Sequence, residues 1–352
     1  MELNNIIFSF FILFIGYFIN KFFLLNIKNN FFNSLIDNQF SKPQAFHEKS
    51  TYRIGGLTIF LLLILVFIYL FLFKNIYMID YMSFCTLFFI LGLIDDMKIT
   101  IAPKLRLLSM LAILIPLIIF NSFFIEKTGL NFLNNLLEID IFALFFVCLC
   151  FLFIINGANL IDGYNGLLSI HAIIILTVLF FINLINGNND ISQFLFFSIL
   201  LILIFLKFNF PKAQMFLGDG GAYLVGCLIA ISIIKTSILN PTVHPFFFCT
   251  LLFYLFFEVF FSFVRKTITI KSNPLFPDSK HLHMLLYKIL LKRKSKMDSN
   301  YLVSIYINII YLFLIIPGIV FMDNGLFCRY YFLSLMLIYI LIYIKFKKIL
   351  GV

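Results

Sequence analysis

The chain has 352 residues, of which 62% are hydrophobic, only 12% are charged and 51 are phenylalanine. A mean hydropathy of +1.07 accompanies an apolar share well above the roughly one half of soluble domains, which excludes a soluble enzyme. The formal net charge of +10 is explained by membrane topology and attraction to anionic lipid, so no nucleic acid partner is needed.

Apolar runs long enough to cross ~30 Å of hydrocarbon as helices recur along the chain. We predict an all-α polytopic membrane protein with about eleven transmembrane helices and a single integral domain over residues 1–352. The first run has no basic n-region or cleavage site, so we expect a retained span. The predicted spans are 4–25, 55–73, 76–94, 105–120, 141–155, 167–186, 191–209, 221–239, 244–264, 301–321 and 327–344.

Basic residues sort strongly between the two sides of this alternation. Of the 26 lysines and arginines, only Lys74, Lys127, Lys235 and Arg329 lie on the side that follows even-numbered spans. By the positive-inside rule the other side is cytoplasmic. We therefore predict an N-terminus outside, a C-terminus in the cytoplasm, and a multi-pass protein of the inner (plasma) membrane.

Five polar segments follow odd-numbered spans and so share the predicted cytoplasmic face. We expect them to form the active site together, because independent accidents would scatter over both faces. Their bounds are 26–54, 95–104, 156–166, 210–220 and 265–300.

The first two segments combine cations with paired carboxylates. His47 and Arg53 stand among lysines and could hold phosphate oxygens, although alone this segment is better explained as a positive-inside loop. Adjacent Asp95 and Asp96 repel each other near hydrocarbon, which favours a bound cation such as Mg²⁺ on a diphosphate. The alternative is a helix end neutralised by cations such as Arg106.

The next two segments are punctuated by glycine. Asn156, Asn159 and Asp162 recur every three residues, so a helix end would align them along a drifting stripe. A simple turn is the less favoured alternative. Asp219 stands among glycines at the start of a span, where a metal ligand and a helix cap are equally good interpretations.

The last segment is basic and contains two histidines. His281 and His283, with Arg265 upstream, indicate an anion site more than a zinc site, because no third nitrogen or sulfur ligand stands nearby. An inward basic loop would explain the lysines and leaves the histidines unexplained.

Taken in order, Asp95-Asp96, the run 156–167, Phe216–Gly220 and Pro277–His283 make the chain similar to the polyprenyl-phosphate N-acetylhexosamine-1-phosphate transferases. The resemblance covers nearly the whole chain. It implies transfer of a sugar 1-phosphate from a UDP-sugar to undecaprenyl phosphate with release of UMP, ten or eleven spans, a cytoplasmic active site and Mg²⁺ as cofactor.

The resemblance also implies roles for individual residues. Asp219 and Asp162 would hold the metal. The catalytic candidates are Asp95, Asp96, His281 and His283. Asp95 would orient or deprotonate the lipid phosphate, and the histidines would neutralise transition-state oxygens. The substrate-binding candidates are His47, Lys104, Arg106, Asn156, Asn159 and Arg265.

Two positions depart from the family pattern. Asn165 stands where many members have an aspartate, and Met284 stands where many have a further histidine. The missing third histidine points away from the peptidoglycan branch and toward enzymes that start O-antigen, capsule or related surface glycans.

Several alternatives stay open. They are the peptidoglycan-branch phospho-MurNAc-pentapeptide transferase, a lipid or solute transporter, a prenyl-transferring membrane enzyme, and a double displacement with an aspartate nucleophile. The sequence leaves open whether the donor is UDP-GlcNAc, UDP-GalNAc or a deoxy-aminosugar. It also leaves open whether the protein forms a homodimer.

Overall fold

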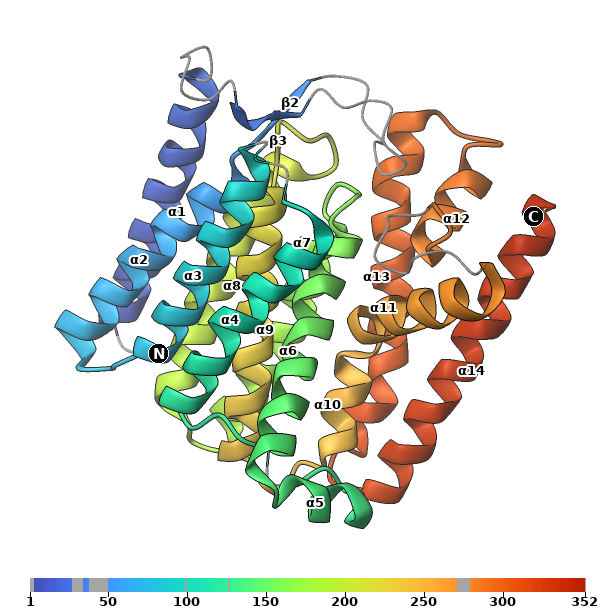
Figure 1. Cartoon of the computed structure of the whole chain (residues 1–352). Helices are drawn as coiled ribbons and strands as arrows, with labels where there is room; N and C mark the ends of the chain where they lie inside the picture. Colours follow the sequence, from blue (N-terminus) through green and yellow to red (C-terminus); the bar gives the residue numbers. More distant parts are fainter. Residues whose placement is uncertain are drawn as a thin grey trace.

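The computed structural model describes residues 3–26, 34–37, 50–97, 99, 101–125, 127–270 and 279–351, with only the backbone at residues 269 and 270. Figure 1 shows a helical bundle with its few strands at one end and the short helix α5 at the other. We call the end that carries the strands the site end. The predicted all-α polytopic fold is confirmed.

The helices follow one another up and down the bundle. They are α1 (Leu3–Leu25), α2 (Gly55–Lys74), α3 (Ile79–Asp96), α4 (Pro103–Phe120), α5 (Asn131–Leu137), α6 (Asp140–Ile161), α7 (Leu167–Ile185), α8 (Asn189–Asn209), α9 (Gly218–Leu239), α10 (Pro245–Leu251), α11 (Phe253–Arg265), the π-helix η2 (Lys266–Ile270), α12 (Leu282–Leu290), α13 (Lys296–Val320) and α14 (Gly325–Leu350).

Within the described residues, nine helices are long and apolar enough to span a membrane, and α10 with α11 would make a tenth span. Helix α3 is not among the nine because it carries Asp80, Asp95 and Asp96. It nevertheless packs in the bundle beside α9. With α3 and the bent pair included, each predicted span coincides with a helix in the structure.

The ninth predicted span differs from a single straight helix. Helices α10 and α11 are bent by 76° around Leu252, so the prediction of one continuous segment over 244–264 was wrong in this respect. Figure 1 shows α11 running across the bundle between α12 and α14. The bend carries the last turns of α11 toward the histidine segment.

A small sheet crosses the site end. Strand β1 (Ile36–Asp37) pairs antiparallel with β2 (Thr51–Arg53), which pairs in parallel with β3 (Met215–Phe216). The register sets Arg53 opposite Phe216, directly before the glycine-rich start of α9. This sheet, absent from the prediction, ties the first polar segment to the fourth.

Candidate active site

The carboxylate of Asp96 anchors the start of α9. Its Oδ1 accepts a hydrogen bond from the backbone N–H of Asp219 (2.9 Å), and its Oδ2 accepts one from the backbone N–H of Gly220 (2.8 Å). The first N–H groups of a helix lack intrahelical partners, and a negative charge suits that end of the helix. The cap of α9 thus comes from α3.

Glycine permits this close approach. A Cβ atom at Gly92 would lie 2.5 Å from the backbone oxygen of Asp219, and one at Gly218 would lie 2.6 Å from Oδ2 of Asp96. Gly218 also has a φ of +80°, a conformation that costs other residues energy. Glycine at positions 92 and 218 therefore allows α3 and the start of α9 to pack in close contact.

Arg53 joins the two acids on either side of it. Its Nη2 lies 2.7 Å from Oδ2 of Asp37, and its Nη1 lies 3.3 Å from Oδ1 of Asp96. Although burial alone would lower the pKa of Arg53, the carboxylates of Asp219, Asp37 and Asp96 together raise it. Arg53, predicted to hold phosphate, contacts protein carboxylates in this structure.

Asp95 faces a different partner from its neighbour. Its Oδ2 lies 3.4 Å from Nη1 of Arg106 on the first turns of α4. Lys104, two residues earlier on the same helix, is exposed. The paired acids thus point to separate cations, and the contact between Asp95 and Arg106 is the one expected in the alternative interpretation of this helix end.

The asparagine-rich run reaches the same place from α6. The side-chain N–H of Asn159 donates to Oδ1 of Asp219 at 2.9 Å. Asp162 ends α6 at its C-cap. Burial, together with repulsion from Asp219 and Asp96, raises the pKa of Asp162 well above its ordinary value, as expected where carboxylates outnumber nearby cations.

The two histidines gather around an acid that the sequence analysis did not single out. Nδ1 of His281 lies 3.1 Å from Oε2 of Glu258 on α11, and Nδ1 of His283 lies 3.7 Å from Oε1. The two imidazole rings are stacked with centroids 5.5 Å apart. All three side chains are buried.

The histidine group touches the asparagine-rich segment through a tyrosine. Tyr164 lies two residues beyond Asp162, and its ring packs edge-on against the His283 ring with centroids 5.7 Å apart. Arg265, at the end of α11, lies buried with its guanidinium 3.3 Å from the Ser262 hydroxyl and over the Tyr343 ring. The site end therefore holds a carboxylate group and a histidine group joined at residues 162–164.

Two predicted site residues remain, Asn156 and His47, and within the described part of the chain Asn156 shows no contact with the carboxylate or histidine groups. Asn156 donates to the Leu152 carbonyl at 2.8 Å and lies beside the sulfur of Met110. His47 lies outside the described residues. Among those that are described, no three His, Cys, Asp or Glu side chains form a metal-ligating group.

The two departures from the family pattern have structural explanations. The side-chain N–H of Asn165 donates to the Pro211 carbonyl (2.9 Å), and its backbone N–H donates to Oδ1 of Asn300 (2.8 Å). An aspartate could not donate the first bond. Met284 is buried in the core at 1% exposure, so its side chain packs within the bundle.

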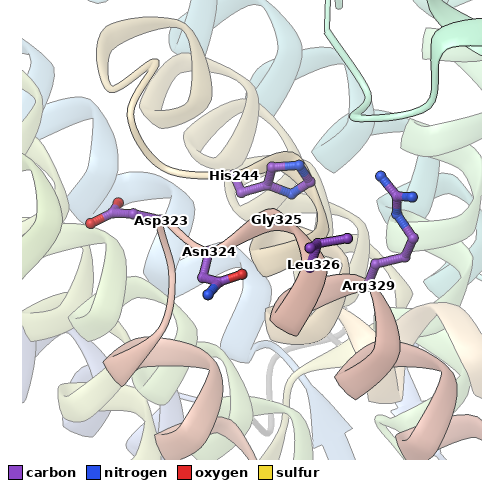
Figure 2. Close-up of a pocket in the computed structure, with 6 residues that line it drawn as sticks. All are labelled: His244, Asp323, Asn324, Gly325, Leu326 and Arg329. Carbon is purple, nitrogen blue, oxygen red and sulfur yellow. The ribbon is translucent and has the colours of Figure 1, made fainter.

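A hollow of about 660 Å³ lies away from this site, beyond the far end of α9. Figure 2 shows the residues that line it: His244 directly before α10, Asp323 and Asn324 in the turn before α14, and Gly325, Leu326 and Arg329 in the first turns of α14. The hollow lies at the end of the bundle opposite the site end, and its lining includes none of the predicted site residues.

Fold and site together define a polytopic membrane protein with a polar, carboxylate-rich centre at one end of its helices. Residues 77–237, which run from the start of α3 to the end of α9, match the family model described as glycosyl transferase family 4. The chain is similar to this family over that segment, which makes up less than half of its length.

Three relatives are similar to between half and three quarters of the chain. The undecaprenyl-phosphate alpha-N-acetylglucosaminyl 1-phosphate transferase of Thermotoga maritima is 28% identical over 238 residues, 67% of this chain and 68% of that protein. A probable undecaprenyl-phosphate N-acetylglucosaminyl 1-phosphate transferase of Bacillus subtilis is 26% identical over 267 residues, 75% of this chain and 73% of its own length. A Campylobacter jejuni phospho-N-acetylmuramoyl-pentapeptide-transferase is 27% identical over 206 residues, 51% of this chain and 58% of its own.

Proposed function

We propose that the protein transfers N-acetylhexosamine 1-phosphate from a UDP-sugar to undecaprenyl phosphate, which releases UMP and starts a lipid-linked surface glycan. The observation that carries this proposal is the meeting of Asn159 and Asp162, at the end of α6, with Asp219, at the start of α9, with the histidine group alongside. A transporter would be expected to gather its ionisable residues near the middle of the membrane.

The choice of branch is supported by two observations. The relatives from Thermotoga and Bacillus, both named for N-acetylglucosaminyl 1-phosphate transfer, cover more of the chain than the Campylobacter pentapeptide transferase does. Met284 packs in the core, at a position where the resemblance would give the peptidoglycan branch a further histidine. Both observations favour the surface-glycan branch, with a UDP-N-acetylhexosamine as donor, over the peptidoglycan branch, with a muramoyl-pentapeptide donor.

The chemistry follows from the charges of the reactants. A phosphate monoester has a second pKa of about 6, so the lipid phosphate is mostly dianionic at neutral pH and needs little deprotonation. In our scheme its oxygen forms a bond to the β-phosphorus of the UDP-sugar. The bond between that phosphorus and the bridging oxygen breaks, and UMP leaves with the bridging oxygen and its electron pair.

The protein's main task is then to offset negative charge. Arg106 and Arg265 would bind phosphate oxygens, and His281 and His283 would donate hydrogen bonds to the oxygens that gain charge. Asp95, paired with Arg106, would orient the lipid phosphate. Asp96 would act as a positioning residue, since both its oxygens already hold the start of α9.

Asp219 and Asp162 are the residues that would hold Mg²⁺. Their oxygens are the hard donors that Mg²⁺ prefers, and this ion commonly uses one or two carboxylates with water and substrate phosphates in the remaining positions. The raised pKa of Asp162 is consistent with a place where a cation is favoured. Bound there, the ion would supply Lewis-acid polarisation of the diphosphate.

The site end faces the cytoplasm in this proposal, where UDP-sugars are found. The asymmetric distribution of lysine and arginine supports that orientation. Attachment of a cysteine-reactive, membrane-impermeant label to single exposed cysteines placed at Lys104 and at Glu138 would test it. Labelling of intact cells at position 104 and not at 138 would contradict it.

The proposed activity is tested with membranes that contain the protein, undecaprenyl phosphate, Mg²⁺ and a panel of UDP-N-acetylsugars. UMP release and a labelled lipid product are expected with at least one donor. No UMP from any donor, in the presence of lipid, would refute the transferase. A radiolabelled protein adduct formed from the UDP-sugar without lipid would replace single displacement by the double-displacement scheme.

A further inference from the structure

Glu258 is the one acid of α11, a helix otherwise made of apolar, aromatic and small residues up to Arg265. It is 1% exposed. A buried carboxylate is costly unless several donors hold it. Its contacts therefore indicate what the acid is for.

Both oxygens of Glu258 face the histidine segment. Oε1 accepts a hydrogen bond from the backbone N–H of Leu282 at 3.1 Å, and Oε2 lies 3.1 Å from Nδ1 of His281. His281 is the N-cap residue of α12 and makes no side-chain cap bond of its own. Glu258 thus supplies the acceptor and the negative charge at the start of α12 from a different helix.

This contact also determines which ring nitrogen carries a proton. A carboxylate only accepts, so Nδ1 of His281 carries a proton that points to Glu258. Nε2 of the same ring can donate to a phosphate oxygen, as the proposed function requires, when the ring carries a second proton. His283 has two groups at its Nδ1, the Tyr254 hydroxyl at 3.2 Å and Oε1 of Glu258 at 3.7 Å. One acid on α11 therefore faces both histidines.

We propose that Glu258 is a positioning residue that holds the rings of His281 and His283 in the orientation needed for phosphate transfer. This inference rests on the proposed function. In this proposal Glu258 contacts neither the UDP-sugar nor the lipid phosphate, and it acts only through the two imidazoles.

The test is a mutant cycle on UMP release by the full-length protein in membranes. Glu258→Gln keeps the size of the side chain and removes its charge, and kcat is expected to fall at least about tenfold while KM for the UDP-sugar stays within about twofold. In the His281→Gln/His283→Gln double variant the same change is expected to lower kcat by less than about twofold, because the groups through which it acts are gone. Glu138→Gln, at an exposed acid of the opposite end, is the matched control.

Glu258→Asp keeps the charge with a shorter reach, and an intermediate kcat with unchanged KM is expected. Additive losses in the cycle, or a raised KM with unchanged kcat, overturn the positioning role while leaving the transferase in place. Loss of the folded protein in both Glu258 variants, with Glu138→Gln intact by size-exclusion chromatography and thermal unfolding, shows a purely structural role. Absence of UMP release from the parent protein refutes the proposed function, and the inference falls with it.

Discussion

Asp96 and Asp219 are 123 positions apart in the chain, yet the carboxylate of the first accepts a hydrogen bond from the backbone N–H of the second at 2.9 Å. The second member of the aspartate pair thus holds the helix start that presents the glycine-flanked acid. Two motifs that look independent in the sequence form one structural unit between α3 and α9.

The first prediction concerns this cap. Asp96→Asn exchanges one acceptor oxygen for an N–H₂ group, so either Asp219 or Gly220 faces a donor with its own N–H. A buried donor left unsatisfied costs about 1–3 kcal/mol. We expect a lower midpoint of thermal unfolding in detergent, and UMP release reduced at least about tenfold because Asp219 is no longer held.

Asp140→Asn is the matched control, since Asp140 is an exposed acid in the first turn of α6. Its unfolding midpoint should equal that of the parent protein. An Asp96→Asn protein as stable and active as the control would show that the cap does not matter for the site.

The second prediction separates backbone conformation from close contact. Gly218 and Gly187 both have positive φ, +80° and +76°, but a Cβ at Gly218 would lie 2.6 Å from Asp96 while one at Gly187 would meet nothing within 4 Å. Both alanine variants bear the conformational cost of about 1 kcal/mol. Only Gly218→Ala should also abolish UMP release.

The readouts are thermal unfolding and the transfer assay, measured on the two variants side by side. Equal activity of Gly218→Ala and Gly187→Ala would mean that the approach of Asp96 to α9 adjusts without consequence. Equal loss of activity would assign the effect to backbone strain alone.

The third prediction concerns the proposed metal ligand. Asp219→Asn removes a negative charge and retains a side-chain oxygen that Asn159 can reach. We expect a folded protein with UMP release lowered at least about a hundredfold, since Mg²⁺ binding depends on the carboxylate. Asp190→Asn, at the corresponding second position of α8 and at the other end of the bundle, should retain full activity.

Isothermal titration with Mg²⁺ in the presence of UDP gives a second readout for Asp219→Asn. Unaltered Mg²⁺ affinity in a folded, inactive variant would remove Asp219 from the list of metal ligands.

Much of the fold follows from hydropathy because each helix must supply about 20 apolar residues. The spans were predicted to within a few residues, and their alternation correctly brought Asp96, Asn159 and Asp219 to one end. The helices extend further than their apolar runs, however. Asp96 ends α3 and Asp219 lies in the first turn of α9, because polar residues at a membrane surface continue a helix without any hydropathy signal.

Other features had weak signals or none. The strands span only two or three residues, too few for a periodic pattern. The 76° bend occurs at Leu252, with neither glycine nor proline at that residue to mark it. Glu258 could have been found, because a lone acid in an apolar segment is expensive and marks a functional candidate.

The last prediction concerns Asn165, which departs from the family's aspartate. Asn165→Asp loses the donor to the Pro211 carbonyl and places a carboxylate beside that oxygen. Asn165 is half-buried and its hydrogen bond to Pro211 lies at the surface, so the new charge can turn toward water, and we expect a loss of only about 0.5–1.5 kcal/mol in unfolding free energy. UMP release should stay within about twofold of the parent, because the asparagine fastens the turn and takes no part in transfer.

Asn189→Asp, at an exposed asparagine of α8, controls for the added charge. A large gain in activity of Asn165→Asp alone would show instead that a carboxylate at this position serves the reaction.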